Sequence, residues 1–79
     1  MDNLQKYQDA FKTSLEIGDR IINDALSYES IPEWDSVGHM RLMAAIEEVF
    51  DIMLETEDIL DFSSFGKGKE ILKKYDVDF

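Results

Sequence analysis

The feature that most constrains the fold is an apolar stripe of helical period between Ser36 and Met53. With Ser36 placed at 0° and each residue advanced by about 100°, Leu42, Ile46, Val49 and Met53 fall between roughly 220° and 280°. A stripe of this kind covers one side of a helix and leaves the other sides polar. The sequence therefore predicts an amphipathic helix from Ser36 to Met53, with these four apolar side chains facing the core.

Three weaker helical patterns flank this segment. The first helix is predicted from an apolar stripe with steps of three and four residues, and Gly18 is its expected end: Leu4, Tyr7, Phe11 and Leu15. A short helix is predicted next, with Thr56 as its cap and Ile59 and Leu60 facing inward. Ser63 or Ser64 is expected to cap a last helix. Its stripe is formed by Phe65, Leu72 and Tyr75.

The stretch from Ser27 to Asp35 has no period, and Pro32 prevents a helix from running through it. A connection of this length in a small domain is often functional. Tyr28 and Trp34 are interpreted as packing residues that anchor it to the core. No segment has the alternation of a strand. The expected fold is all-α: residues 1–79 form one domain, a small four-helix bundle with three main helices, a short third helix and a long loop between the first two.

The charge limits the partners of such a domain. The chain has 18 acidic and 8 basic residues, a formal net charge of −10. This balance argues against nucleic acid and against an anionic membrane surface, both of which attract Lys and Arg. Residues 33–61 hold nine of the acids and a single base, Arg41. A basic protein partner or a cationic ligand remains.

The sequence also bears on location. No apolar run reaches the roughly 18 residues of a membrane span, and the first residues do not have the pattern of a signal peptide. The absence of cysteine fits a reducing compartment. We expect a cytoplasmic protein without a membrane span.

A second face of the Ser36–Met53 helix mixes apolar groups with charged ones. This face comprises Val37, Met40, Arg41, Ala44, Glu47 and Glu48, followed by Asp51. A purely solvated face is more often entirely polar, whereas apolar groups add contact area and acids orient a partner. The pattern favours a docking surface.

Enzyme templates do not fit the sequence. There is no cysteine, there is one histidine, and the acids do not follow a calcium-binding loop pattern. His39 lies toward the core side of its helix and is interpreted as a packed, hydrogen-bonded side chain. We therefore expect no catalytic residue and no metal site.

Ser36 follows Asp35 at the junction of the long loop and the main helix. One interpretation is that it caps the helix, as serine often does. The other is that its exposed hydroxyl carries a phosphate ester, since a helix start offers free N–H groups and a partial positive charge. The sequence leaves both interpretations open.

Two motifs at this junction resemble the acyl carrier protein family. The family has Asp-Ser-Leu before its second helix and Glu-Glu-x-Phe-Asp near that helix's end. Here Asp35-Ser36-Val37 and Glu47-Glu48-Val49-Phe50-Asp51 stand at the expected spacing. The similarity extends through the later helices, whereas residues 1–30 match only by helix pattern.

The resemblance implies that Ser36 carries a 4′-phosphopantetheine arm, attached by a phosphopantetheinyl transferase, whose thiol holds an acyl group as a thioester. Asp35 would help to position the transferase and its metal. The mixed helix face would receive acyl-loading and acyl-transferring enzymes through their basic docking patches. The protein would be a monomer and not itself an enzyme.

Two departures from the family pattern point to a specialised stand-alone carrier. Arg41 stands where carriers of fatty-acid synthesis usually have an acid, and Gly38-His39-Met40 replaces their Asp-Thr-Val. The alternative is an unmodified acidic helical adaptor for a basic partner, in which Ser36 is only a cap. The enzyme hypothesis has no set of residues to support it.

Overall fold

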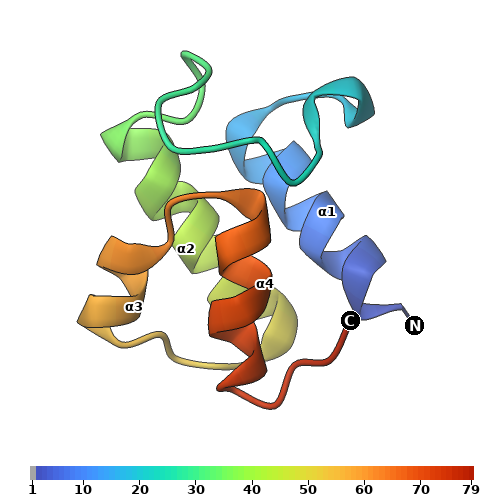
Figure 1. Ribbon diagram of the computed structural model, residues 1–79, viewed down its shortest axis with the longest axis vertical. Coiled ribbons are helices and arrows are strands. Elements are labelled where there is room, and N and C mark those ends of the chain that lie inside the picture. Colours follow the sequence, from blue (N-terminus) through green and yellow to red (C-terminus); the bar gives the residue numbers. More distant parts are fainter. Residues whose placement is uncertain (1) are drawn as a thin grey trace.

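The computed structural model describes residues 2–79, which form four α-helices and one turn of 3₁₀-helix (Figure 1). Their bounds are α1 Asn3–Leu15, η1 Asp19–Ile21, α2 Ser36–Phe50, α3 Thr56–Asp61 and α4 Phe65–Lys73. Within the described residues the β-type pairing is limited to an isolated antiparallel bridge between Ser27 and Ser64. The predicted all-α fold is confirmed, with three main helices, a short third helix and a long loop between the first two.

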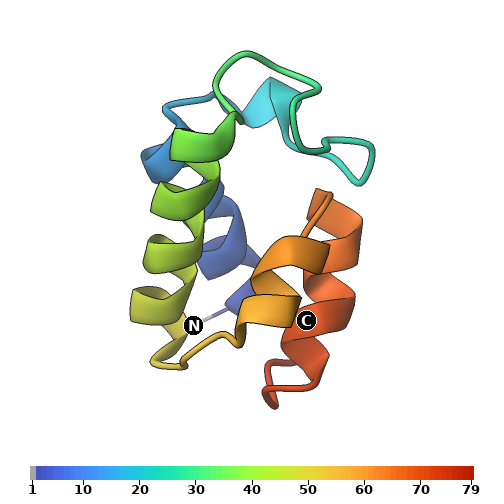
Figure 2. The same ribbon diagram turned by 90° about the vertical axis from the view of Figure 1, so that its left-hand side faces the viewer.

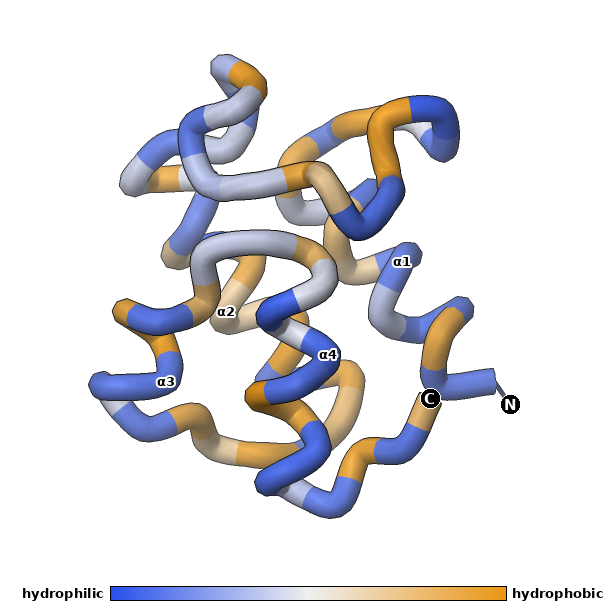
Figure 3. Tube along the Cα trace, in the orientation of Figure 1, coloured by the Kyte–Doolittle hydropathy of each residue, from blue (hydrophilic) through white to orange (hydrophobic). Residues whose placement is uncertain are grey.

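The helices surround one core in a molecule of about 30 × 27 × 20 Å. Figure 2 shows α3 and α4 side by side and facing α2, while the long loop crosses the end of the bundle where α2 begins. Apolar and polar residues alternate at short intervals along α4, as Figure 3 shows, because only one side of that helix faces inward. The largest fully enclosed side chains are Trp34, Tyr7, Phe11 and Phe62.

Each of the three main helices begins at a side-chain cap. The carboxylate of Asp2 accepts the Leu4 N–H at 3.1 Å in α1, and the Ser64 hydroxyl accepts the Lys67 N–H at 3.0 Å in α4. Such caps satisfy backbone donors that have no partner inside the helix. The sequence prediction of Ser63 or Ser64 as the last cap is confirmed at Ser64. The prediction of Thr56 as a cap is wrong, because Glu55 holds the cap position of α3 and no side chain caps that helix.

Two helices end earlier than predicted, because acidic residues rather than glycines terminate them. The helix expected to reach Met53 stops at Phe50, and Asp51 takes a left-handed conformation with φ 53°. Glu16 ends α1 in the same way with φ 55°, ahead of Gly18. Since the chain turns at Asp51, Met53 leaves the core face and is 84% exposed.

Three predicted core positions are wrong for related reasons. Besides Met53, Val49 is 39% exposed near the end of α2, and Leu60 on α3 is 77% exposed. On α3 the buried position belongs instead to Asp58. A six-residue helix has little inward surface, which Asp58 shares with Ile59; Ile59 is partly buried against the core, as predicted.

Asp58 joins α3 to α4. Its carboxylate accepts hydrogen bonds from the Lys74 ammonium at 2.5 Å and from the Tyr75 hydroxyl. The hydrogen bond from Lys74, followed by that from Tyr75, lowers the pKa of Asp58 below its ordinary 3.8. The Glu55 N–H donates to the Tyr75 hydroxyl at 3.0 Å, so the start of α3 is held at the same point.

None of the helices in residues 2–79 has both the length and the apolar character that crossing a bilayer requires.

Candidate functional site

Ser36 is exposed at the first residue of α2, but it does not cap the helix. The cap is Asp35, whose side-chain oxygen Oδ1 accepts the Gly38 N–H at 2.8 Å. The Asp35 carbonyl accepts the His39 N–H, also at 2.8 Å. The interpretation of Ser36 as the helix cap is therefore wrong, because the Asp35 side chain accepts the capping hydrogen bond and the Ser36 hydroxyl does not.

Gly38 allows the long loop to lie against the start of α2. A Cβ atom at this position would stand 2.2 Å from the carbonyl oxygen of Glu33 and 3.0 Å from Cδ2 of Leu15. No side chain fits there without moving the backbone. The departure from the family pattern at Gly38 thus has a structural cause, namely this close approach of the loop.

His39 connects the long loop to α3. The indole Nε1 of Trp34 donates to His39 Nδ1 at 3.0 Å, and His39 Nε2 lies 2.8 Å from the carbonyl oxygen of Ile59. The sequence prediction of a packed, hydrogen-bonded histidine is confirmed. Because both ring nitrogens are engaged, His39 has no free nitrogen with which to activate the Ser36 hydroxyl.

Tyr28 reaches the candidate serine from the long loop. Its hydroxyl lies 3.2 Å from Ser36 Oγ, within hydrogen-bond distance. Its backbone N–H donates to the Ser63 carbonyl at 2.8 Å, which ties this part of the loop to the segment before α4. The prediction that Trp34 packs is confirmed by its 0% exposure, whereas Tyr28 is 37% exposed and makes only edge contacts with the rings of Trp34 and His39.

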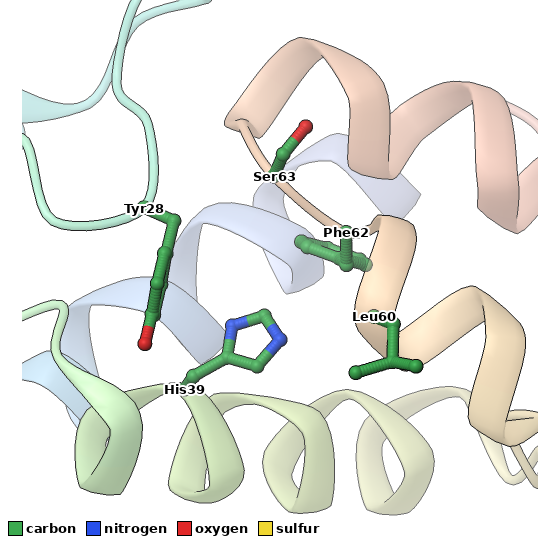
Figure 4. Close-up of a pocket in the computed structure, with 5 residues that line it drawn as sticks. All are labelled: Tyr28, His39, Leu60, Phe62 and Ser63. Atoms are coloured by element: carbon green, nitrogen blue, oxygen red, sulfur yellow. The ribbon is translucent and has the colours of Figure 1, made fainter.

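A pocket of about 190 Å³ adjoins Tyr28. It lies between the loop, α2 and α3, and is lined by Tyr28, His39, Leu60, Phe62 and Ser63. Figure 4 shows Tyr28 and Leu60 on opposite sides of His39, with the Tyr28 hydroxyl pointing toward the start of α2. Sequence spacing did not predict this pocket, because its lining comes from three segments that are brought together only by the tertiary fold.

The predicted docking face forms a shallow, open groove along α2. The groove is lined by Ser36, Val37, Met40, Arg41 and Ala44. Val37 is 60% exposed and Met40 is 58% exposed, so the groove has an apolar floor open to solvent. The structure thus brings the candidate serine together with four of the six residues of the predicted face.

The two acids of that face differ in their surroundings. Glu48 is exposed. Glu47 is half-buried, and its Oε2 accepts the Leu54 N–H at 2.9 Å, which fixes the turn after α2. Glu48 is therefore the freer of the two acids for contact with a partner.

Within residues 2–79 the structure contains no group of three or more histidine, cysteine or acidic side chains arranged to hold a metal ion. Comparison of the chain with protein-family models, with curated proteins and with solved structures gave no match. The candidate site consists of the exposed hydroxyl of Ser36, the adjacent phenol of Tyr28 and the apolar groove on α2.

Proposed function

We propose that this protein is an acyl carrier protein, which holds acyl intermediates on a 4′-phosphopantetheine arm attached to Ser36 and presents them to partner enzymes of a specialised pathway. The observation that carries the proposal is that Asp35, and not Ser36, caps α2, while the Ser36 side chain beside it is exposed. A serine needed only for capping would occupy the capping position.

The residues present fit a phosphodiester at Ser36. From Ser36 onward the first turn of α2 contains no acidic side chain, and the partial positive charge of the helix start favours an anion, as it already does for the Asp35 carboxylate that accepts the Gly38 N–H. The hydroxyl is exposed, which a transferring enzyme requires. When bound, the arm would supply the thiol that this cysteine-free chain lacks, and that thiol would carry the acyl group as a thioester.

Attachment is a phosphoryl transfer to Ser36 with coenzyme A as donor. The bond between Ser36 Oγ and the transferred phosphorus forms, and the pyrophosphate bond of coenzyme A breaks. Adenosine 3′,5′-bisphosphate leaves with the electron pair, and the serine proton passes to a base of the transferase. Asp35 stands next to Ser36 and is proposed to help position the transferase and its metal.

The groove on α2 is the proposed docking surface for the phosphopantetheinyl transferase and for acyl-loading and acyl-transferring enzymes. Val37, Met40 and Ala44 offer apolar contact, and Glu48 offers a charge to a basic patch. The net charge of −10 accelerates encounter with such patches and permits weak, exchangeable binding. A monomeric, cytoplasmic carrier belongs to this proposal.

The test is the intact mass of the protein before and after incubation with coenzyme A, Mg²⁺ and a broad-specificity phosphopantetheinyl transferase. We expect the wild type to gain one phosphopantetheinyl group and Ser36→Ala to gain none. Ser63→Ala, which removes another exposed serine, is the matched control and should still be modified. An unmodified wild type with an intact helical circular dichroism spectrum would contradict the proposal.

The second candidate is an acidic adaptor that is never modified and binds a basic protein partner. The exposure of Val37 and Met40 within an acidic molecule favours it. In that case Ser36→Ala leaves partner binding unchanged, whereas Met40→Asp in the groove weakens it.

A further inference from the structure

The hydroxyl of Ser36 has a side-chain partner that is set in place by other parts of the fold. Tyr28 Oη lies 3.2 Å from Ser36 Oγ, and either oxygen can be the donor. The two residues belong to different segments, the long loop and α2. Their contact therefore depends on how the loop folds over the start of the helix.

Several contacts fix Tyr28 independently of Ser36. Its N–H donates a hydrogen bond to the Ser63 carbonyl, and the neighbouring residue Ser27 forms the isolated antiparallel β-bridge with Ser64. Its ring packs against that of His39 in an edge-to-face arrangement, with centroids 5.3 Å apart and planes at 70°. The phenol is thus held at Ser36 by the backbone and by ring packing.

We propose that Tyr28 is a positioning residue for Ser36, which orients the serine hydroxyl before modification and donates a hydrogen bond to the same oxygen afterwards. The inference rests on the proposed function. A free serine hydroxyl and a phenol can each donate or accept. Once Ser36 Oγ is esterified it has no proton, so the hydrogen bond has one possible direction, from Tyr28 to Ser36.

Tyr28 also lies between Ser36 and the pocket, so its contact with Ser36 links the two. One side of its ring lines the pocket formed with His39 and Leu60, and its hydroxyl end touches Ser36, as Figure 4 shows for the orientation of the ring. A hydrogen bond at that end ties the attachment point to the pocket wall. Loss of the Tyr28 hydroxyl would remove the hydrogen bond to Ser36, while the ring of residue 28 would still line the pocket.

The test compares Tyr28→Phe with the wild type and with Tyr75→Phe. The first variant removes one oxygen and keeps the ring contacts with His39 and Trp34. The second removes a phenol hydroxyl from the contact between α3 and α4 instead. Steady-state kinetics of modification by the transferase and the ³¹P resonance of the modified protein are measured for all three.

We expect Tyr28→Phe to lower kcat of modification by about threefold to tenfold, as for the loss of one uncharged hydrogen bond, with KM changed less than about twofold. We expect kcat rather than KM to change, because Tyr28 does not line the docking groove. The ³¹P resonance of modified Tyr28→Phe should differ from that of the wild type, while that of modified Tyr75→Phe coincides with it. A protein that is only destabilised would show no change in the resonance at a temperature where it is folded.

Either an unchanged kcat or an unchanged ³¹P resonance in Tyr28→Phe overturns this inference while leaving the carrier function intact. Failure of the wild type to be modified overturns both together. The two failures are distinguished by the wild-type mass alone.

Discussion

The indole of Trp34 and the imidazole of His39 have nearly parallel planes, inclined by 17°, with ring centroids 6.2 Å apart, and are joined edge to edge by a hydrogen bond of 3.0 Å. An indole nitrogen only donates, so His39 Nδ1 has to accept. The proton of the neutral ring therefore lies on Nε2, which donates to the Ile59 carbonyl at 2.8 Å. One imidazole in a defined tautomer thus joins the loop, α2 and α3.

Replacing His39 by phenylalanine should separate packing from hydrogen bonding. The aromatic ring remains, but the buried indole N–H and the Ile59 carbonyl lose their partner. We expect a loss of about 1–3 kcal/mol in the free energy of unfolding, measured by urea denaturation followed by circular dichroism. In a double-mutant cycle with Trp34→Phe, the two losses should be less than additive. Full additivity would show that the two rings are not energetically coupled.

Gly38→Ala should disrupt the junction, because the added Cβ would collide with the Glu33 carbonyl oxygen. We expect a destabilisation of about 1–3 kcal/mol, typical of forcing extra volume into a packed site. Gly18→Ala is the matched control: a Cβ there meets nothing within 4 Å and φ is −92°, so its stability should be unchanged or slightly raised. Equal thermal midpoints for the two variants would contradict this account.

The contact of Asp58 with Lys74 and Tyr75 predicts a pH dependence of stability. A carboxyl group whose pKa is lowered by folding stabilises the protein above its unfolded pKa, and that stability is lost as the pH falls through the folded pKa. Lys74, whose pKa is raised by the hydrogen bond to Asp58, contributes below its ordinary 10.5 and loses this contribution as the pH rises through its folded pKa.

Asp58→Asn should therefore lower the thermal midpoint at pH 7 and flatten its decline below about pH 4. Asp61→Asn removes the same charge from the exposed part of α3 without breaking these hydrogen bonds. Similar melting curves for the two variants at pH 7 would mean that net charge, rather than the α3–α4 contact, sets the effect.

Glycine at the left-handed end of α1 should stabilise the protein. Glu16 has φ 55°, a conformation that a residue with a Cβ adopts at a cost and glycine adopts freely. Glu16→Gly is expected to add about 0.5–1 kcal/mol to the free energy of unfolding. Asp51→Gly should add less, because aspartate tolerates this region better than glutamate does. The reverse order in denaturant melts would show that the caps do not limit stability.

Arg41→Glu should improve use of the protein by fatty-acid elongation enzymes with basic docking patches. The side chain is exposed in the α2 groove, and the change replaces repulsion by attraction. An exposed charge pair of about 0.2–1 kcal/mol corresponds to a gain of up to roughly fivefold in kcat/KM at low salt. Arg20→Glu, an exposed site outside the groove, is the control for net charge. An unchanged or lower elongation rate would exclude Arg41 as a specificity determinant.

The sequence predicted the helices well where apolar periodicity decides the structure, as at Leu42 and Ile46, which are fully buried. It failed where the determinant is tertiary. The end of α2 depends on a left-handed aspartate at position 51, whereas sequence signals for such an end rely on glycine. Leu60 is exposed because Asp58 finds a hydrogen-bonded place inside, which depends on α4.

In the candidate site, too, the sequence predicted what motif and periodicity determine and missed what tertiary contacts determine. The position of Ser36 at the start of a helix and the mixed face beside it followed from the motif and the period. The contact of Tyr28 with Ser36 did not, because it depends on the path of a loop without periodicity. Gly38 appeared only as a departure from a family pattern, and the backbone contact that requires it emerges from the fold.

Trp34 is the single tryptophan of the chain and is fully enclosed, two residues from Ser36 and hydrogen-bonded to His39. The molecule therefore carries one intrinsic fluorophore, seated at the junction that the proposed attachment would alter. The fluorescence emission of Trp34 in the unlabelled protein reports the local environment of this junction and is insensitive to events at distant surfaces. We expect the proposed attachment and docking, as well as loosening of the loop, to change the emission of Trp34, which can be followed in real time without a dye.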